Sequence, residues 1–272
     1  MPPAFPPSAA GGGITVLSLH GAVLAAAAGL VAGGVNAVAG GGTLITFPAL
    51  LATGMAPVTA NITSSVGLLS GYAGGSLAYH RELVGQGGRV RALGLASVLG
   101  AAVGALLLLR TPATVFRSAV PFLVLLSSLL LALQPWLARR VAARRTGSDA
   151  DGTPPEITSL VRCGVFVGAA YGSYFGAGLG VLLLALLGTL LHDGLQRLNA
   201  LKGLLSLLIN VVGVTVFIVS GRIEWPYAAI LAVTAYGGGH LGVALARRLP
   251  AAALRSSVVL LGLVVSAVLF IR

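Results

Sequence analysis

The sequence predicts an all-α polytopic membrane protein made of two repeats with inverted topology, each with about four to five transmembrane segments. Three observations support this fold class. Hydrophobic residues make up 57% of the chain and charged residues 8%, too little charge to cover a soluble globule of 272 residues. The apolar runs are rich in Leu, Ala and Gly and lack the period-2 alternation of β-barrel strands. The chain also aligns with itself.

The self-alignment places residues 14–134 over residues 152–272 at a constant offset of 138, without a gap. It pairs like with like: Asn61 with Asn199, Gly40 with Gly178, Gly42 with Gly180, and Arg110-Thr-Pro-Ala with Arg248-Leu-Pro-Ala. Gly matches are common in this composition, whereas the Arg-Pro-Ala match is specific. Repeats of this size build many secondary transporters, which hold their substrate where the two halves meet.

About ten helical segments are expected, five in each half. In chain order the apolar runs cover residues 16–36, 43–55, 59–79, 92–109, 118–137, 160–175, 178–191, 198–219, 226–246 and 253–271. The runs 43–55 and 178–191 are short, since thirteen helical residues rise about 20 Å and a hydrocarbon core is roughly 30 Å thick. Whether these two runs cross fully stays open, so the chain has eight or ten crossings.

The distribution of basic residues predicts the orientation. If all ten segments cross, all but four of the 17 Lys and Arg residues fall on one side, which is therefore cytoplasmic. Five segments per half is an odd number, so the second half enters from the opposite face. The predicted organisation is a disordered N-terminal tail (1–13), a first membrane repeat (14–137), a cytoplasmic linker (138–158) and a second membrane repeat (159–272). The expected location is the cell (inner or plasma) membrane.

Glycine-rich breaks interrupt the apolar pattern at matching places in the two halves. The first is Asn36-Ala-Val-Ala-Gly40-Gly41-Gly42-Thr43, and the second runs from Tyr171 through Tyr174 to Gly178 and Gly180. A broken helix leaves free N–H groups, and the positive end of its dipole favours an anion. Paired breaks therefore predict an anion site. The alternative is close helix packing, which is expected at the four-residue spacings Gly29/Gly33, Gly67/Gly71/Gly75 and Gly100/Gly104.

Polar residues in the long apolar runs extend the predicted substrate site. Asn61-Ile-Thr63-Ser64 opens one run, Asn199-Ala-Leu-Lys202 opens the matching run, and Asn210 lies mid-segment. Each has a structural alternative: a helix cap for the first cluster, snorkelling to the headgroups for Lys202, and a helix–helix bond for Asn210. The full predicted substrate-binding set is Asn36, Gly40, Gly41, Gly42, Thr43, Asn61, Thr63, Ser64, Tyr174, Gly178, Gly180, Asn199, Lys202 and Asn210.

The chain resembles the sulfite exporter TauE/SafE family of membrane transporters. The resemblance rests on Gly29-Leu-Val-Ala-Gly-Gly, Gly40-Gly-Gly-Thr-Leu-Ile-Thr-Phe-Pro48 and Ala60-Asn61-Ile-Thr63-Ser64-Ser65, and it extends over residues 15–272. It implies movement of sulfur-containing anions, such as sulfite or sulfonates, across the inner membrane without ATP hydrolysis. In the second half Gly176-Ala-Gly178-Leu-Gly180 replaces the triple glycine, and no proline matches Pro48.

The function expected from these observations is a permease for a small anion that works by alternating access. An anion channel is the alternative. An enzyme is disfavoured, because no Ser or Cys has an intramembrane base and no residues have metal-ligand spacing, so no catalytic residue, metal or cofactor is predicted.

The net charge of +11 comes from arginines between apolar runs, which excludes nucleic acid as a partner. The predicted partners are the anion and the lipid bilayer; a homo-oligomer stays open. Asp193 is expected in a solvated loop.

Overall fold

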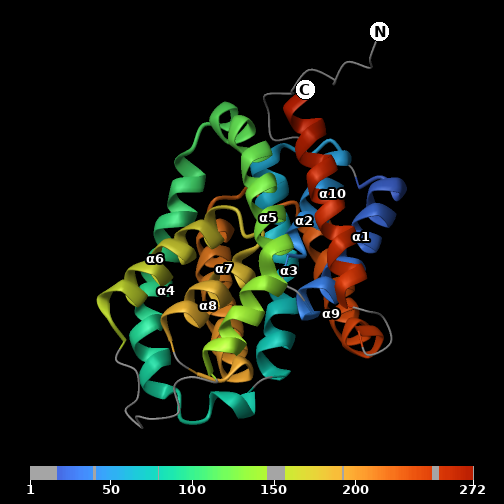
Figure 1. Cartoon of the computed structure of the whole chain (residues 1–272). Helices are drawn as coiled ribbons and strands as arrows, with labels where there is room; N and C mark the ends of the chain where they lie inside the picture. Colours follow the sequence, from blue (N-terminus) through green and yellow to red (C-terminus); the bar gives the residue numbers. More distant parts are fainter. Residues whose placement is uncertain are drawn as a thin grey trace.

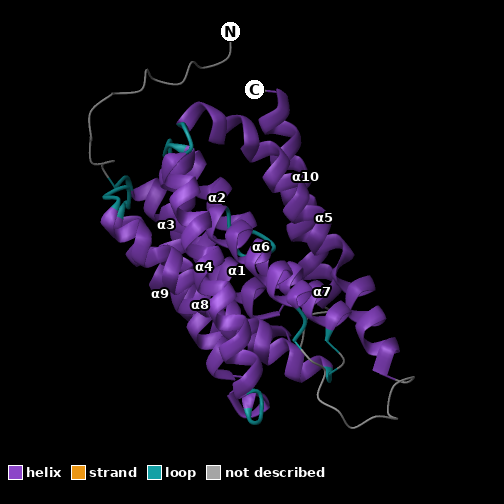
Figure 2. Ribbon diagram, turned by 90° about the vertical axis from the view of Figure 1, so that its left-hand side faces the viewer, coloured by secondary structure: helices purple, strands orange, loops and turns teal. Residues whose placement is uncertain are grey.

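The computed structural model describes residues 17–38, 41–78, 80–145, 157–191, 193–246 and 251–271. These residues form ten α-helices and one 3-10 helix and contain no strand, so the predicted all-α fold is confirmed (Figure 2). The first half holds α1 (Leu19–Val38), α2 (Thr43–Ala52), α3 (Pro57–Ala78), η1 (His80–Leu83), α4 (Gly87–Arg110) and α5 (Ala113–Arg145). The second half holds α6 (Ser159–Tyr174), α7 (Leu179–Leu190), α8 (Leu195–Val219), α9 (Trp225–Ala246) and α10 (Ala251–Ile271).

The surface of the bundle is apolar, as a membrane protein requires. Four described stretches are long and apolar enough to cross a membrane by length and composition: Leu19–Asn36, Gly87–Arg110, Ala113–Leu137 and Gln196–Val219. Large hydrophobic side chains point outward from them, including Leu107 on α4 and Phe122 on α5. Such a surface is unfavourable in water and suited to hydrocarbon. The chain is a multi-pass membrane protein.

Helix boundaries follow the 138-residue repeat. Adding 138 to the first residue of each α-helix in the first half gives a position within two residues of the start of its counterpart in the second half. Two contacts fix the relative direction of α3 and α8: Tyr72 shares a side-chain hydrogen bond with Asn210, and Ser76 lies beside Gly203. Residue numbers rise along α3 while they fall along α8, so these counterpart helices are antiparallel, as in an inverted repeat.

The packing divides the helices differently from the sequence. α1 packs mainly on α9 and its counterpart α6 mainly on α4, while α3 packs on α9 and α8 on α4. We call α1, α2, α3 and α9 the first packing unit and α4, α6, α7 and α8 the second packing unit. α5 and α10 pack on each other and lie side by side in Figure 1. In addition, α5 packs on α7 and α10 packs on α2. Each unit thus combines helices from both repeats.

Glycines allow the closest contacts within each packing unit. A Cβ on Gly33 would lie 2.1 Å from the carbonyl oxygen of Ala235, and one on Gly104 would lie 2.0 Å from that of Ala170. The predicted packing role is confirmed for these glycines. It is wrong for Gly71, where an added Cβ would have no described neighbour within 4 Å.

The helix α5 is longer than the sequence analysis predicts. It continues to Arg145, so the first residues of the expected linker 138–158 are helical, and residues 146–156 lie outside the described part. The Arg140 guanidinium stacks 4.0 Å from the centre of the Trp136 ring, an arrangement typical of the end of a membrane helix.

Candidate functional site

The first helix break carries its own cap. α1 ends at Val38 and α2 begins at Thr43; Gly40 lies outside the described residues. Asn36 Oδ1 accepts hydrogen bonds from the N–H groups of Gly41, at 3.0 Å, and Gly42, at 2.8 Å. The φ of 134° at Gly41 is open to glycine and strained for other residues. Two of the N–H groups expected to face an anion are therefore already hydrogen bonded.

The second helix break is held by side chains outside it, and its N–H groups are only partly paired, since that of Leu179 donates to the Gly176 carbonyl at 3.4 Å. Gly176 and Gly178 have φ of 80° and 76°, which redirects the chain between α6 and α7. The hydroxyls of Tyr171 and Ser127 donate to the Ala177 carbonyl, at 2.9 and 3.0 Å, and so fix the break to α5. No side chain caps α7, and no described group accepts from the N–H of Gly180.

The two breaks meet between the packing units. Thr43, the first residue of α2, has its Oγ1 3.7 Å from the place that a Cβ would take on Gly176. The rings of Phe47 and Phe175 pack edge to face with centroids 5.4 Å apart. The N-termini of α2 and α7, the positive ends of both helix dipoles, therefore converge.

Four polar side chains gather at this junction, and we call them the break cluster: Thr43, Thr46, Asn61 and Ser64. None is more than 3% exposed. The Thr46 and Ser64 hydroxyls hydrogen bond to each other, and Thr46 also donates to the Gly42 carbonyl at 3.3 Å. Asn61 Nδ2 donates to the Tyr174 carbonyl at 2.9 Å and thus joins the first packing unit to the second. The cluster contains no charged group.

Aromatic rings cover one side of the break cluster. Phe116 lies 5.7 Å from Tyr174 and 6.5 Å from Phe175, between ring centroids. The Tyr174 hydroxyl donates to Thr111 Oγ1, at 3.4 Å, in the connection between α4 and α5. Phe116 and Phe175 were not predictable as site residues, because single aromatics in an apolar run look like ordinary core residues.

Thr63 is buried like the break cluster but has a structural partner. Its Oγ1 accepts a hydrogen bond from the N–H of Glu224, at 3.1 Å, directly before α9. This side chain therefore ties the start of α9 to α3, within the first packing unit.

Asn199, Lys202 and Asn210 lie away from the break cluster. Lys202 Nζ donates to Asn199 Oδ1 at 3.2 Å, and the next residue, Gly203, faces Ser76. Ser76 is 15 residues beyond Asn61 on α3, which corresponds to about 22 Å along the helix. The structure thus separates the predicted site into the break cluster and a basic region near the start of α8, which consists of Asn199 and Lys202.

Asn210 has the contacts of a residue that joins two helices. Its Nδ2 donates to the Ser206 carbonyl at 2.8 Å, and its side chain hydrogen bonds to Tyr72 on α3. Tyr72 and Asn210 are counterparts in the repeat, so they lie close to the axis that relates the halves.

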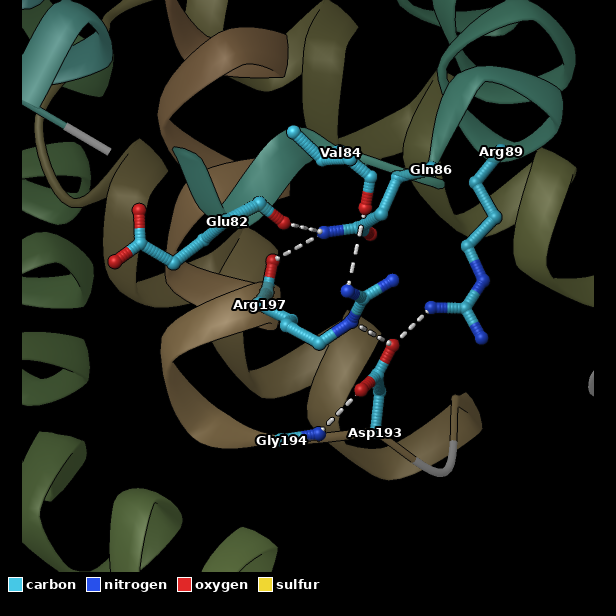
Figure 3. A network of polar contacts seen from close by, with 7 residues as sticks. All are labelled: Glu82, Val84, Gln86, Arg89, Asp193, Gly194 and Arg197. Atoms are coloured by element: carbon cyan, nitrogen blue, oxygen red, sulfur yellow. Dashed lines mark hydrogen bonds and ion pairs between the residues drawn. The ribbon is translucent and has the colours of Figure 1, made fainter. Parts of the chain in front are cut away.

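An ionic network ties α4 to α8, as Figure 3 shows. Asp193 Oδ2 accepts from Arg89 and from Arg197, the latter at 3.2 Å, and Asp193 Oδ1 accepts from the Gly194 N–H at 2.6 Å. Gln86 Nε2 adds a bond to the Arg197 carbonyl at 3.1 Å. Partial burial by itself raises the pKa of Asp193, but these hydrogen bonds outweigh it and lower the pKa below its usual value. The sequence predicts Asp193 in a solvated loop, and this prediction is wrong, because the side chain is largely buried in ion pairs with Arg89 and Arg197.

A bundle of apolar helices whose two broken members meet at a buried polar cluster has the architecture of a membrane transporter. In the described part of the chain no group of His, Cys, Asp and Glu could hold a metal ion. The chain belongs to the sulfite exporter TauE/SafE family, whose sequence model matches residues 25–269.

Curated relatives are similar over most of their length. A probable membrane transporter protein of Haemophilus influenzae is 28% identical over 88% of this chain and 90% of its own. The probable membrane transporter protein YfcA of Escherichia coli is 28% identical over 88% of this chain and 85% of its own, and the probable membrane transporter protein ORF9 of Sinorhizobium is 27% identical over 83% of each. No solved structure matches. The predicted family is confirmed, and it identifies a membrane transporter.

Proposed function

We propose that the protein is a secondary transporter of a small sulfur-containing anion, such as sulfite or a sulfonate, and that the anion binds at the break cluster. The observation that supports this most is the convergence of the N-termini of α2 and α7 on buried hydroxyl and amide groups. Helix N-termini attract anions through their dipoles, and at the start of α7 the N–H of Gly180 also has no described acceptor. We assign no catalytic step to the protein.

The charges around the cluster also favour an anion. The acidic residues of the described part, Glu82, Asp193 and Glu224, lie at helix ends or in connections, and none of them belongs to the break cluster. Binding without a full positive charge nearby keeps affinity moderate, which a transporter needs in order to release its substrate. The basic region around Lys202 lies about 22 Å from the cluster along α3 and would attract anions toward the cytoplasmic end.

Alternating access follows from the two packing units. The units touch at the site through Asn61 with Tyr174 and Phe47 with Phe175, and along α3 and α8 through Tyr72 with Asn210. The contacts inside each unit bring helix backbones close together. Movement of one unit against the other would open the cluster and leave each unit intact. Because the side chains of the break cluster are buried, this conformation is closed around the proposed site.

Transport by purified protein in ATP-free proteoliposomes tests this function. We expect saturable uptake of labelled sulfite or a sulfonate, accelerated by the same anion inside the vesicles. Thr46→Val should reduce uptake about tenfold because it removes a hydroxyl from the cluster. The matched control is Thr215→Val, on the exposed surface of α8, which should transport normally. Uptake that does not saturate and shows no counter-exchange would indicate a channel instead.

A further inference from the structure

We propose that the transported oxyanion carries a hydrogen-bond donor of its own, as hydrogen sulfite does, and that Asn61 Oδ1 accepts from it. This inference rests on the proposed function and narrows its substrate class. It predicts that the site selects a protonated monoanion over anions without a donor.

The orientation of the Asn61 amide is fixed by its partner. Its nitrogen lies 2.9 Å from the Tyr174 carbonyl oxygen. A carbonyl can only accept, so the NH₂ group must face Tyr174 and the amide oxygen must point elsewhere. The amide therefore presents an acceptor to the rest of the site.

This acceptor has no donor in the described part of the protein. Asn61 is fully buried, and its Oδ1 has no hydrogen-bond partner. The hydroxyl protons of Thr46 and Ser64 are already used, because Thr46 donates to the Gly42 carbonyl and Ser64 must then donate to Thr46. Buried acceptors are nearly always satisfied, so one without a partner at a ligand site indicates a ligand that donates.

The whole site is complementary to a partly protonated oxyanion. The free N–H at the start of α7 suits an oxygen that bears negative charge, and Asn61 Oδ1 suits an O–H. A fully deprotonated dianion would place its lone pairs against Oδ1, and burying its double charge would cost far more than burying a single charge. Because the Asn61 amide does not titrate, its oxygen remains an acceptor at every pH, and the site therefore favours a substrate that carries a proton to donate.

A change in internal pH follows from this selectivity. Each hydrogen sulfite that enters a vesicle can release its proton and become sulfite, so uptake should acidify the interior by one proton for each anion that dissociates. The rate of uptake should follow the concentration of hydrogen sulfite, not that of total sulfite, as the external pH is changed.

The test uses the full-length protein in proteoliposomes that contain a pH-sensitive dye. The probes are labelled sulfite across the pH range of its ionisation, sulfate as a dianion, and methanesulfonate as a monoanion without a donor. We expect sulfite uptake with internal acidification, and uptake of both other anions slower by about tenfold or more. In Asn61→Leu, purified as a folded monodisperse protein, the preference for sulfite over methanesulfonate should fall by about the same factor.

The wild-type measurements decide the question even if the variant does not fold. Methanesulfonate or sulfate uptake as fast as sulfite uptake, or sulfite uptake without acidification, would overturn this inference and leave the proposed anion transporter standing. Absence of flux for every anion would overturn the proposed function, and the inference with it.

Discussion

Two asparagine side chains lie at the helix breaks and use their amides differently. Asn36 Oδ1 accepts two backbone N–H groups at the start of α2, so its oxygen is fully occupied. Asn61 uses its nitrogen to hold the end of α6 and keeps its oxygen unpaired. The same residue type thus stabilises one break and, in our proposal, receives the ligand at the other.

Asn36→Leu tests the first of these roles. The change leaves the N–H groups of Gly41 and Gly42 without an acceptor, so we expect a loss of about 1–2 kcal/mol in stability. The measurement is thermal or chemical unfolding in detergent. Gln196→Leu, at an exposed position near the start of α8, is the matched control and should change stability by no more than about 0.5 kcal/mol. Equal stability of Asn36→Leu and wild type would show that these hydrogen bonds contribute nothing.

Asp193→Asn tests the ionic network. Since the folded protein lowers the pKa of Asp193, its ionised form stabilises the fold above the usual aspartate pKa, and this contribution is lost as the pH falls through the lowered value. At neutral pH we expect the variant to be less stable by about 1 kcal/mol, a modest amount because the pair is partly exposed. The difference between wild type and variant in unfolding curves should shrink toward zero in acid. A difference that stays constant down to strongly acidic pH would contradict this.

At the level of elements, the existence and order of the helices were predictable because they depend on local hydropathy and on the glycines that interrupt it, whereas some ends were not, since α5 continues to Arg145. All ten α-helices of the described residues correspond to apolar runs in the sequence. The partners of each helix were not predictable in the same way. The glycine spacing is equally visible at Gly71 and at Gly104, and only the three-dimensional arrangement shows that Gly104 meets another backbone.

Alanine substitutions should separate these two glycines. Gly104→Ala would force a Cβ to within 2.0 Å of the Ala170 carbonyl, so α4 and α6 must move apart. We expect a loss of at least about 1–3 kcal/mol or a failure to accumulate folded protein. Gly71→Ala meets no described atom and should be neutral, or stabilising by up to about 1 kcal/mol through helix propensity. Yield and unfolding temperature of the purified proteins measure both effects, and similar behaviour of the two variants would contradict the packing described here.

For the whole molecule, the arrangement of the repeats explains why the predicted site divided. Asn61 and Asn199 are counterparts, and the sequence alignment suggests that they belong together. In an inverted pair, however, counterparts become neighbours only near the relating axis, as Tyr72 and Asn210 do. Asn61 lies near one end of α3 and Asn199 near the start of the antiparallel α8, so the two asparagines lie at opposite ends. Distance from the axis is a tertiary property that a sequence match does not contain.

Engineered disulfides can test whether the packing units move during transport. Cys163 is the natural cysteine, and replacing it by Ala gives a background for pairs of new cysteines. Ser76→Cys with Gly203→Cys links α3 to α8 across the units, and Gly164→Cys with Leu186→Cys links α6 to α7 within the second unit; both pairs lie in close contact. Oxidation should block uptake for the first pair only, and reduction should restore it. Normal uptake with the first link formed would show that the units do not move apart there.

The two breaks also differ in when their partners are synthesised. Asn36 precedes Gly41 and Gly42 by only a few residues, so the first break can be satisfied as soon as it enters the bilayer. The second break depends on Asn61 and Ser127, which lie on helices that leave the ribosome earlier. Unpaired backbone groups are costly in hydrocarbon, and proteins are made from the N-terminus. The residues that hold each break are therefore synthesised before that break or together with it. Neither break depends for these hydrogen bonds on a helix that is made later.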